Sequence, residues 1–318
     1  MRNNQTLSPV LFLIFNRPDT TKLVFEQIKA AKPTKLYIAA DGPRLNSPTD
    51  AQLCRETLDV VQEIDWQCEV KTLYREVNLG CKHSVSSAID WFFENEEEGI
   101  ILEDDCLPSA DFFPYCDTLL AKYRFDTRIR HIAGSNLQLG KKWGDASYYF
   151  ANQTHVWGWA SWRRVWADYD KELSTYSIED ANVIIDKIFK DAFVAEDWKQ
   201  IFKRLKAGEI DTWDYQLALI NFFNNSLSIN PNVNLISNIG FRSDGTHTTD
   251  TENPYANLNL DKIDELLHPH YFIPESEADY AVFSRDLNLE ERWRRHNLLR
   301  RRFKRWLKLQ FKSNNIRQ

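Results

Sequence analysis

The chain has 318 residues, of which 43% are hydrophobic and 13% aromatic, so it has ample material for a packed core and is not a disordered protein. No stretch approaches the ~20 apolar residues that span a bilayer. The net charge of −6 is unevenly distributed, because residues 292–312 contain ten Arg or Lys and no acid. Residues 1–291 carry 29 basic against 46 acidic residues, a balance of −17. The body of the protein therefore offers no general basic surface for nucleic acid.

Two features of the sequence predict a cytoplasmic protein. The short apolar run 9–15 follows a polar terminus and lacks the length and the cleavage site of a secretory signal. The five cysteines are an odd number with no CxxC pair, which fits thiols that are kept reduced. We expect Cys106 to pack within the fold rather than to react.

The first 105 residues alternate four times between apolar runs of strand length and amphipathic stretches of helix length. The predicted strands are residues 9–15, 35–40, 69–73 and 99–102. The helices expected between them are residues 20–30, with Asp19 as the cap, 49–64 and 82–94. This spacing suits βαβ crossovers and predicts an α/β fold, in which helices flank a mostly parallel, Rossmann-like sheet.

The alternation weakens after residue 130. We expect a strand at 130–134, a helix over 178–206, a second helix at 213–224 with Asp211 as a candidate cap, and a short strand at 232–238. The absence of an internal repeat or a low-complexity linker favours one continuous domain. We divide it into a donor-binding half at 1–125, an acceptor-binding and catalytic half at 126–290, and a basic amphipathic tail at 291–318.

Three consecutive acids, Glu103, Asp104 and Asp105, directly follow the apolar run 99–102 and are called here the acidic triplet. Adjacent carboxylates repel one another, and a hard divalent cation such as Mg²⁺ or Mn²⁺ removes that repulsion and prefers oxygen ligands. One carboxylate on the metal would leave diphosphate oxygens and water to complete its shell. An exposed acidic turn or helix cap before Pro108 is the alternative, which the position at a strand end disfavours.

Polar residues also follow the other predicted strands. Arg17 comes after the first strand and Asp41 after the second, and ligands bind beyond the carboxyl ends of parallel strands. Arg17 is a candidate for phosphate, and Asp41 is suited to accept a hydrogen bond from a uracil-type imide N–H. Asn78 and Lys82 are further candidates for donor binding, Lys82 through phosphate near a helix N-terminus. Simple solvation of Lys82 is the alternative.

The segment Gly99-Ile-Ile-Leu-Glu-Asp-Asp-Cys-Leu-Pro-Ser-Ala-Asp-Phe-Phe113 resembles the donor-site segment of GT-A glycosyltransferases related to N-acetylglucosaminyltransferase I. In that group a Glu-Asp-Asp motif replaces the commoner Asp-X-Asp. The run Phe15-Asn-Arg-Pro18 resembles the group's first strand with its nucleotide-contacting Arg, and Asp41 stands where the group places an Asp on the uracil. The matching order spans roughly residues 8–120, and Val156-Trp-Gly-Trp159 resembles bacterial sugar-transferase relatives.

The resemblance implies a role for individual residues. Asp105 would ligate the metal, while Glu103 and Asp104 would contact the donor sugar and the ribose. Asp214 would be the catalytic base that deprotonates the acceptor hydroxyl. The sequence departs from the group at the next position, where Tyr215 stands in place of a second acid. Without the resemblance, Asp214 is an ordinary acid in the first turn of a helix.

Two further segments are candidates for the same site. Arg242 and His247 belong to a Gly-bounded polar loop, which we expect to close over the donor as the corresponding loop of the GT-A group does. Trp157 and Trp159 lie in a Trp-rich segment at 154–169, and one of them is the candidate platform on the acceptor side. Packing in the core is the alternative for both tryptophans.

The basic tail places apolar residues on one helical face amid Arg and Lys, namely Leu299, Phe303, Trp306 and Leu307. A basic amphipathic helix suits an anionic membrane surface. Residues 292–312 therefore predict peripheral association with the inner face of the membrane. The alternative is a solvated helix that packs on the acidic body.

These features together predict an inverting, metal-dependent glycosyltransferase that uses Mn²⁺ or Mg²⁺. The expected donor is UDP-linked, with UDP-GlcNAc as the particular candidate, and the expected acceptor is a glycan or lipid-linked hydroxyl in surface polysaccharide synthesis. One alternative is a sugar-1-phosphate nucleotidyltransferase, for which residues 15–19 lack the usual Gly-rich basic loop. Another is a non-catalytic nucleotide-sugar-binding protein, which would need no base at Asp214.

Overall fold

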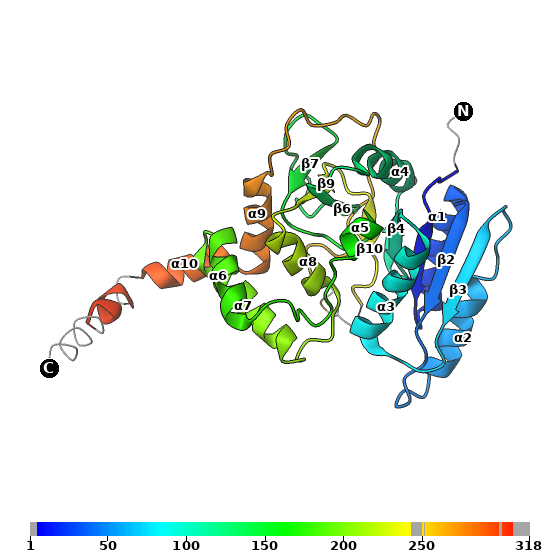
Figure 1. Cartoon of the computed structure of the whole chain (residues 1–318), viewed down its shortest axis with the longest axis horizontal. Helices are drawn as coiled ribbons and strands as arrows, with labels where there is room; N and C mark the ends of the chain where they lie inside the picture. Colours follow the sequence, from blue (N-terminus) through cyan, green and yellow to red (C-terminus); the bar gives the residue numbers. More distant parts are fainter. Residues whose placement is uncertain (1–4, 243–249, 251, 299–300, 308–318) are drawn as a thin grey trace.

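The computed structural model describes residues 5–242, 250, 252–298 and 301–307. At its centre is an eight-stranded sheet with the strand order β3-β2-β1-β4-β8-β6-β9-β7 (Figure 1). The first four strands along the chain are mutually parallel and comprise β1 (Val10–Ile14), β2 (Lys35–Ala40), β3 (Glu69–Tyr74) and β4 (Glu98–Glu103). The α/β class and the mostly parallel sheet flanked by helices are therefore confirmed.

The crossover helices cover both faces of this parallel half. They are α1 (Pro18–Ala31), α2 (Asp50–Val60) and α3 (Gly80–Asn95). Phe12 and Ile38 pack on the face covered by α1, whereas Leu13 and Tyr37 pack on the face covered by α3. Because both faces of β1, β2 and β4 are buried, these strands are nearly continuous apolar runs, whereas the edge strand β3 is largely exposed and contains charged residues.

The second half of the sheet mixes strand directions. β8 (Trp159–Trp162) runs antiparallel between β4 and β6 (Ile129–Ala133). β9 (Leu227–Pro231) is parallel to β6, and β7 (Tyr148–Ala151) forms the antiparallel edge. One sheet thus runs without a break from the N-terminal half of the chain into the C-terminal half.

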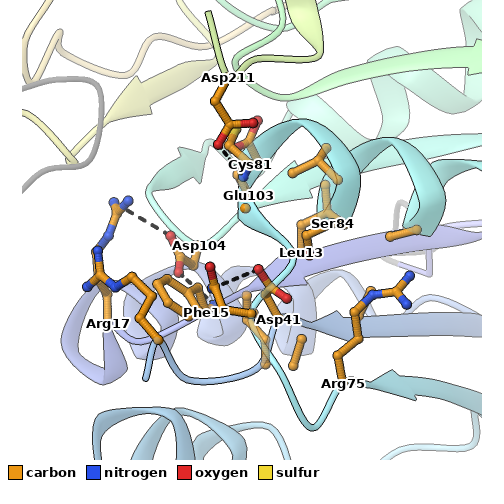
Figure 2. A pocket seen from close by; sticks show the side chains of 18 residues that line it. Leu13, Phe15, Arg17, Asp41, Arg75, Cys81, Ser84, Glu103, Asp104 and Asp211 are labelled. Carbon is orange, nitrogen blue, oxygen red and sulfur yellow. Dashed lines mark hydrogen bonds and ion pairs between the residues drawn. The ribbon is translucent and has the colours of Figure 1, made fainter. Parts of the chain in front are cut away.

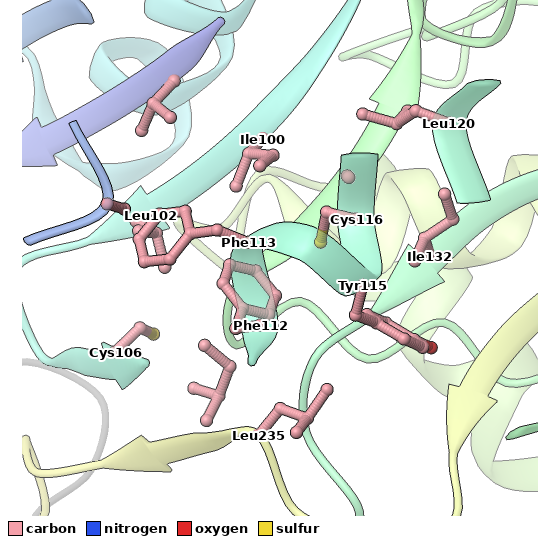
Figure 3. Close-up of a cluster of buried hydrophobic side chains, with 14 of the residues drawn as sticks. Ile100, Leu102, Cys106, Phe112, Phe113, Tyr115, Cys116, Leu120, Ile132 and Leu235 are labelled. Atoms are coloured by element: carbon pink, nitrogen blue, oxygen red, sulfur yellow. The ribbon is translucent and has the colours of Figure 1, made fainter. Parts of the chain in front are cut away.

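A small second sheet holds the chain that leaves the acidic triplet. β5 (Cys106–Pro108) pairs with β10 (Ile236–Asn238), and α4 (Phe112–Tyr123) follows. Phe112 and Phe113, at the start of α4, pack with Leu102 and Cys106 in the buried cluster of Figure 3. Cys106 is fully buried there, as the sequence led us to expect.

A third group of helices forms a separate core beside the sheet. α6 (Ile178–Ile188), α7 (Ala192–Lys206) and α8 (Asp214–Phe223) contribute most of it. α5 (Arg163–Trp166), α9 (Ser276–Asp286) and α10 (Leu289–Asn297) complete the named helices. No helix in these described ranges is long and apolar enough to cross a membrane.

Several predicted boundaries are wrong for identifiable reasons. α1 begins at Pro18, with Arg17 rather than Asp19 in the cap position, because the fixed φ of proline suits the first position of a helix. Residues 178–206 form two helices, since the Asp191 side chain accepts hydrogen bonds from two backbone N–H groups and starts a new helix. Of the residues 232–238 that were expected to form a strand, only 236–238 do so. The helix α2 ends at Val60 and not at residue 64.

Candidate functional site

A cavity of about 300 Å³ opens at the carboxyl ends of β1, β2 and β4, where the sequence placed the site (Figure 2). Its wall contains Glu103 and Asp104 of the triplet, and Arg17, Asp41 and Asn78. The structure thus brings five of the predicted donor-binding residues to one place. Apolar side chains complete the wall and come from the strand ends and from α3: Leu13, Ile14, Ala39, Ala40, Val85 and Ala88.

The acidic triplet is held between the end of β4 and the small second sheet. Asp104 and Asp105 are 5% and 9% exposed, and Glu103 is partly exposed at the cavity wall. Burial raises the pKa of Glu103 and of Asp104, and the neighbouring carboxylates raise that of Glu103 further. The triplet is therefore short of positive charge, which a ligand-bound cation would supply.

Arg17 is the cation that faces the triplet in this structure. Its Nη1 atom lies 2.6 Å from Oδ2 of Asp105 and 3.6 Å from Oδ1 of Asp104. The backbone N–H of Phe15 also donates to Oδ2 of Asp104 at 3.2 Å. These contacts join the end of β1 to the end of β4, so the position of Arg17 is coupled to that of the triplet.

The chain after β10 lies directly against Asp105. The backbone N–H of Ile239 donates to the carbonyl oxygen of Asp105 at 2.9 Å. A Cβ atom on Gly240 would lie only 2.1 Å from Oδ2 of Asp105, so no side chain fits at this position. Arg242 pairs with Asp19 on α1, which places the start of the predicted loop beside the triplet. His247 lies outside the described residues.

Asp41 is held in the cavity wall by hydrogen bonds from three residues. Its carboxylate accepts from Nδ2 of Asn78 at 2.9 Å, from the backbone N–H of Gly42 at 2.9 Å, and from that of Leu79 at 3.0 Å on Oδ1 and 3.2 Å on Oδ2. Burial nevertheless leaves the pKa of Asp41 raised. Asn78 and Leu79 therefore orient the Asp41 carboxylate toward the cavity that it lines.

Two arginines that the sequence analysis missed also line the cavity. Arg75 directly follows β3, and its Nη2 atom donates to Ser87 Oγ at 2.7 Å. Arg44 makes a two-point ion pair with the buried Asp50, with N–O distances of 2.6 and 3.0 Å. The strand-end rule that found Arg17 and Asp41 would have found Arg75 had it been applied to β3. Both are suited to an anionic ligand.

Asp211 is a further residue of the wall that the sequence analysis placed elsewhere. It does not cap α8, whose cap position is Trp213. Its carboxylate accepts instead from the backbone N–H groups of Cys81 at 3.2 Å and Lys82 at 3.0 Å, and so occupies the N-terminus of α3. Gly80 has a φ of +78° and packs against the same carboxylate. This helix terminus already has its anion.

Lys82 does not line the cavity. Its side chain is buried, and its Nζ atom lies 2.8 Å from Oε2 of Glu172. Because Glu172 pairs with this ammonium group and Asp211 occupies the nearby helix N-terminus, both features that suggested a phosphate contact for Lys82 already have an anionic partner. Among the described residues, the cations that line the cavity are Arg17, Arg44 and Arg75.

Asp214 is the first residue of α8 and stands just outside the cavity wall. Its Oδ1 atom accepts from the hydroxyl of Thr212 and from the backbone N–H of Tyr215. The other oxygen, Oδ2, accepts no hydrogen bond from the described residues. It is therefore the atom of Asp214 that could act as a base. Burial and the aspartates of the triplet raise the pKa of Glu103, and the charge of Asp214 adds to this effect.

The two candidate tryptophans have different surroundings. Trp159 is 1% exposed and stacks on Trp213, with ring centroids 5.7 Å apart, so it belongs to the core. Trp157 is partly exposed and contacts Phe241 edge-on at 5.6 Å, next to the chain that covers Asp105. Of the pair, only Trp157 has a surface that a sugar could meet.

The acidic triplet is suited to a cation that takes few of its ligands from the protein. Among the described residues, no group of three or more His, Cys, Asp or Glu side chains is arranged to hold a metal ion. The raised pKa values of Glu103 and Asp104 still mark a place where positive charge is favourable. Asp105 is not among the residues of the cavity wall and pairs with Arg17, so its role as the metal ligand stays a prediction, in which oxygens of a bound diphosphate would provide further ligands.

Comparison with known proteins adds little to this geometry. The chain matches no protein-family model and no curated protein. Among solved structures it overlaps with 4-diphosphocytidyl-2C-methyl-D-erythritol synthase from Anaerococcus prevotii, with a TM-score of 0.34, 10% identity, and 54% of this chain and 78% of that chain covered. HddC from Yersinia pseudotuberculosis gives 0.32 and 10%, with 51% and 80% covered.

UDP-glucose pyrophosphorylase complexed with UDP-glucose overlaps with a TM-score of 0.36 at 9% identity, covering 70% of this chain and 89% of that chain. Overlaps at this level define no family. The class of the protein accordingly rests on its own strand order and cavity. It is an α/β protein with a charged cavity at the carboxyl ends of its parallel strands.

Proposed function

We propose that this protein is an inverting, metal-dependent glycosyltransferase of the GT-A type. It takes a sugar from a nucleoside-diphosphate donor, with UDP-GlcNAc as the particular candidate, and transfers it to a hydroxyl of a glycan or lipid-linked acceptor. The observation that carries the proposal is the cavity itself, in which Glu103, Asp104 and Arg17 lie in one wall with Asp41 and Arg75. One end suits a diphosphate with its cation, and the other suits a nucleoside base.

The donor would lie across the strand ends. The base would lie against the apolar wall near Ala39 and Val85, and its imide N–H would donate to the carboxylate of Asp41. Arg17, beside the triplet, would supply positive charge to the diphosphate, and Arg75 would contact the donor at the end near Asp41. Glu103 and Asp104 would accept hydrogen bonds from hydroxyls of the sugar and ribose.

Transfer requires one group that accepts the proton of the acceptor hydroxyl and one that stabilises the negative charge of the leaving nucleoside diphosphate. The free oxygen of Asp214 would take the proton of the acceptor hydroxyl while that hydroxyl oxygen bonds to the anomeric carbon. The bond from the anomeric carbon to the diphosphate oxygen breaks on the opposite face, and its electron pair leaves with the nucleoside diphosphate. A divalent cation held by Asp105 supplies charge stabilisation for that leaving group when bound.

A sugar-1-phosphate nucleotidyltransferase is the second candidate, since a cationic cavity beside a metal-binding carboxylate also suits pyrophosphate chemistry. The segment after β1 disfavours it, because α1 begins at Pro18, only four residues beyond β1, and leaves no room for a Gly-rich phosphate loop. A non-catalytic nucleotide-sugar-binding protein would use the same cavity without Asp214.

A panel of UDP-, GDP-, CMP- and dTDP-sugars, with and without Mn²⁺, distinguishes these functions. The proposal predicts metal-dependent release of the nucleoside diphosphate from one donor. Formation of UTP and sugar 1-phosphate on addition of pyrophosphate would instead identify the nucleotidyltransferase. Binding without turnover, unchanged in Asp214→Asn, would identify the non-catalytic protein.

A further inference from the structure

The C-terminal helical segment at 301–307 projects from the body of the protein, and its two aromatic side chains are exposed there. Figure 1 shows it beyond α10, at the end opposite the parallel strands. Phe303 and Trp306 are 60% and 54% exposed, and their rings stack on each other at 5.9 Å. Large exposed aromatic side chains on a projecting helix mark a surface that meets a partner.

The segment is attached to the body through α10 and not through its own side chains. Leu289 of α10 is fully buried, and Nε1 of Trp293 donates to Asp191 at 2.8 Å. Farther along, Arg305 donates to the carbonyl oxygen of His296 at 2.7 Å, which ties the last helical turns back to α10. The first part of the basic tail thus packs on the acidic body, where Arg292 also pairs with Asp197, whereas Phe303 and Trp306 of the segment remain exposed.

The charge around the aromatic pair has one sign. Residues 301–307 contain four Arg or Lys and no acid, whereas residues 1–291 carry a balance of −17. The four basic residues of the segment, Arg301, Arg302, Lys304 and Arg305, are all exposed. An anionic surface would therefore attract the tail and repel the body.

We propose that residues 301–307 dock the protein on an anionic lipid bilayer. Basic side chains of the segment bind lipid phosphates, while Phe303 and Trp306 enter the boundary between headgroups and acyl chains. The combination favours a bilayer over nucleic acid or an acidic protein, because aromatic rings at an interface gain from burial in the acyl boundary. The opposite charges of tail and body orient the molecule with its tail toward the membrane.

Sedimentation of the full-length protein with vesicles tests this proposal. Wild type is expected to bind vesicles of phosphatidylcholine with 30% phosphatidylglycerol at least about tenfold more tightly than pure phosphatidylcholine, and less tightly at 0.5 M salt than at 0.1 M. F303A/W306A is expected to weaken binding about tenfold, as is R301Q/R302Q/K304Q/R305Q. The matched control Phe125→Ala removes a side chain that is 88% exposed elsewhere and should leave binding unchanged.

Three results would overturn the proposal. Equal binding of wild type and F303A/W306A to the anionic vesicles would exclude a role for the aromatic pair. Binding of an oligonucleotide without binding of vesicles would assign the tail to nucleic acid. Self-association in sedimentation velocity that F303A/W306A abolishes, again without vesicle binding, would assign it to a second copy of the chain. The melting temperatures of both tail variants check that they fold.

Discussion

Nη1 of Arg17 lies 2.6 Å from Oδ2 of Asp105, so the residue proposed for the metal has an arginine as its counter-ion. The two residues follow neighbouring parallel strands, and 88 positions separate them in the sequence. A divalent cation at Asp105 must therefore share that carboxylate with Arg17 or displace it. Substitution of single residues can therefore test how a metal ion affects donor binding at this site.

Asp105→Asn should abolish the stimulation of donor binding by Mn²⁺, because the amide cannot neutralise a cation as a carboxylate does. We expect affinity for a nucleotide-sugar in the presence of metal to fall at least about tenfold, or about 1.4 kcal/mol. Calorimetric titration with and without Mn²⁺ measures the effect. Asp65→Asn, on an exposed carboxylate distant from the cavity, is the control. Unchanged metal stimulation in Asp105→Asn would remove this residue as the ligand.

Gly240→Ala should weaken donor binding as well as stability. Its Cβ atom would lie 2.1 Å from Oδ2 of Asp105, so the carboxylate or the backbone must move, at a cost of about 1–3 kcal/mol. Gly144→Ala is a matched control, because Gly144 has a φ of +65° but open space around it. That control should lose only about 1 kcal/mol of stability and keep its donor affinity. Equal donor affinity in both variants would contradict the contact with Asp105.

Asp211→Ala should destabilise the start of α3 by about 1–2 kcal/mol, because two backbone N–H groups lose their acceptor. Urea unfolding measures this change. Asp145→Ala, at an exposed position, should have little effect. The capping role would be refuted by a free energy of unfolding within 0.5 kcal/mol of the wild-type value, a margin of about the size seen for ordinary surface changes.

Glu103→Gln should make the metal-free protein more stable at alkaline pH. Burial and the neighbouring carboxylates raise the pKa of Glu103 from 4.5 to about 8 in the folded state. A raised pKa favours folding while the group is protonated, and that stability is lost as pH rises from 4.5 to about 8. The variant lacks this loss, so it should exceed wild type by on the order of 1–3 kcal/mol at pH 8.

Urea unfolding at pH 5 and pH 8, with a chelator present, checks the effect of Glu103→Gln. The difference from wild type should be small at pH 5 and larger at pH 8. Glu26→Gln, an exposed position on α1, should give no such trend. A difference of the same size at both pH values would show that Glu103 carries no raised pKa.

The parallel half of the fold was predictable from the sequence because three of its four strands are buried on both faces. Residues 36–40, for example, are apolar throughout, and the turns between strands and helices have distinctive composition. The same regularity placed Arg17 and Asp41 at one edge of the sheet. Both residues indeed line the cavity together with Glu103 and Asp104.

The parts that were not predictable depend on contacts between distant segments. Asp211 meets Lys82 across 129 residues, and nothing near Asp211 in the sequence indicates that it occupies the N-terminus of α3. Likewise, the burial of Trp159 follows from the insertion of β8 between β4 and β6, which reverses the strand direction. Local periodicity cannot report either arrangement.

The central claim is that the cavity binds a nucleotide-sugar, and equilibrium titration of UDP-GlcNAc in the presence of Mn²⁺ tests it most directly. The account predicts saturable binding by wild type, at least about tenfold weaker binding by Arg75→Ala, and unchanged binding by Arg55→Ala, which removes an exposed arginine of α2 outside the cavity. If UDP-GlcNAc does bind, equal affinities in all three proteins would place it elsewhere. Failure of UDP-GlcNAc and of every other nucleotide-sugar to bind, with metal present, would contradict the claim.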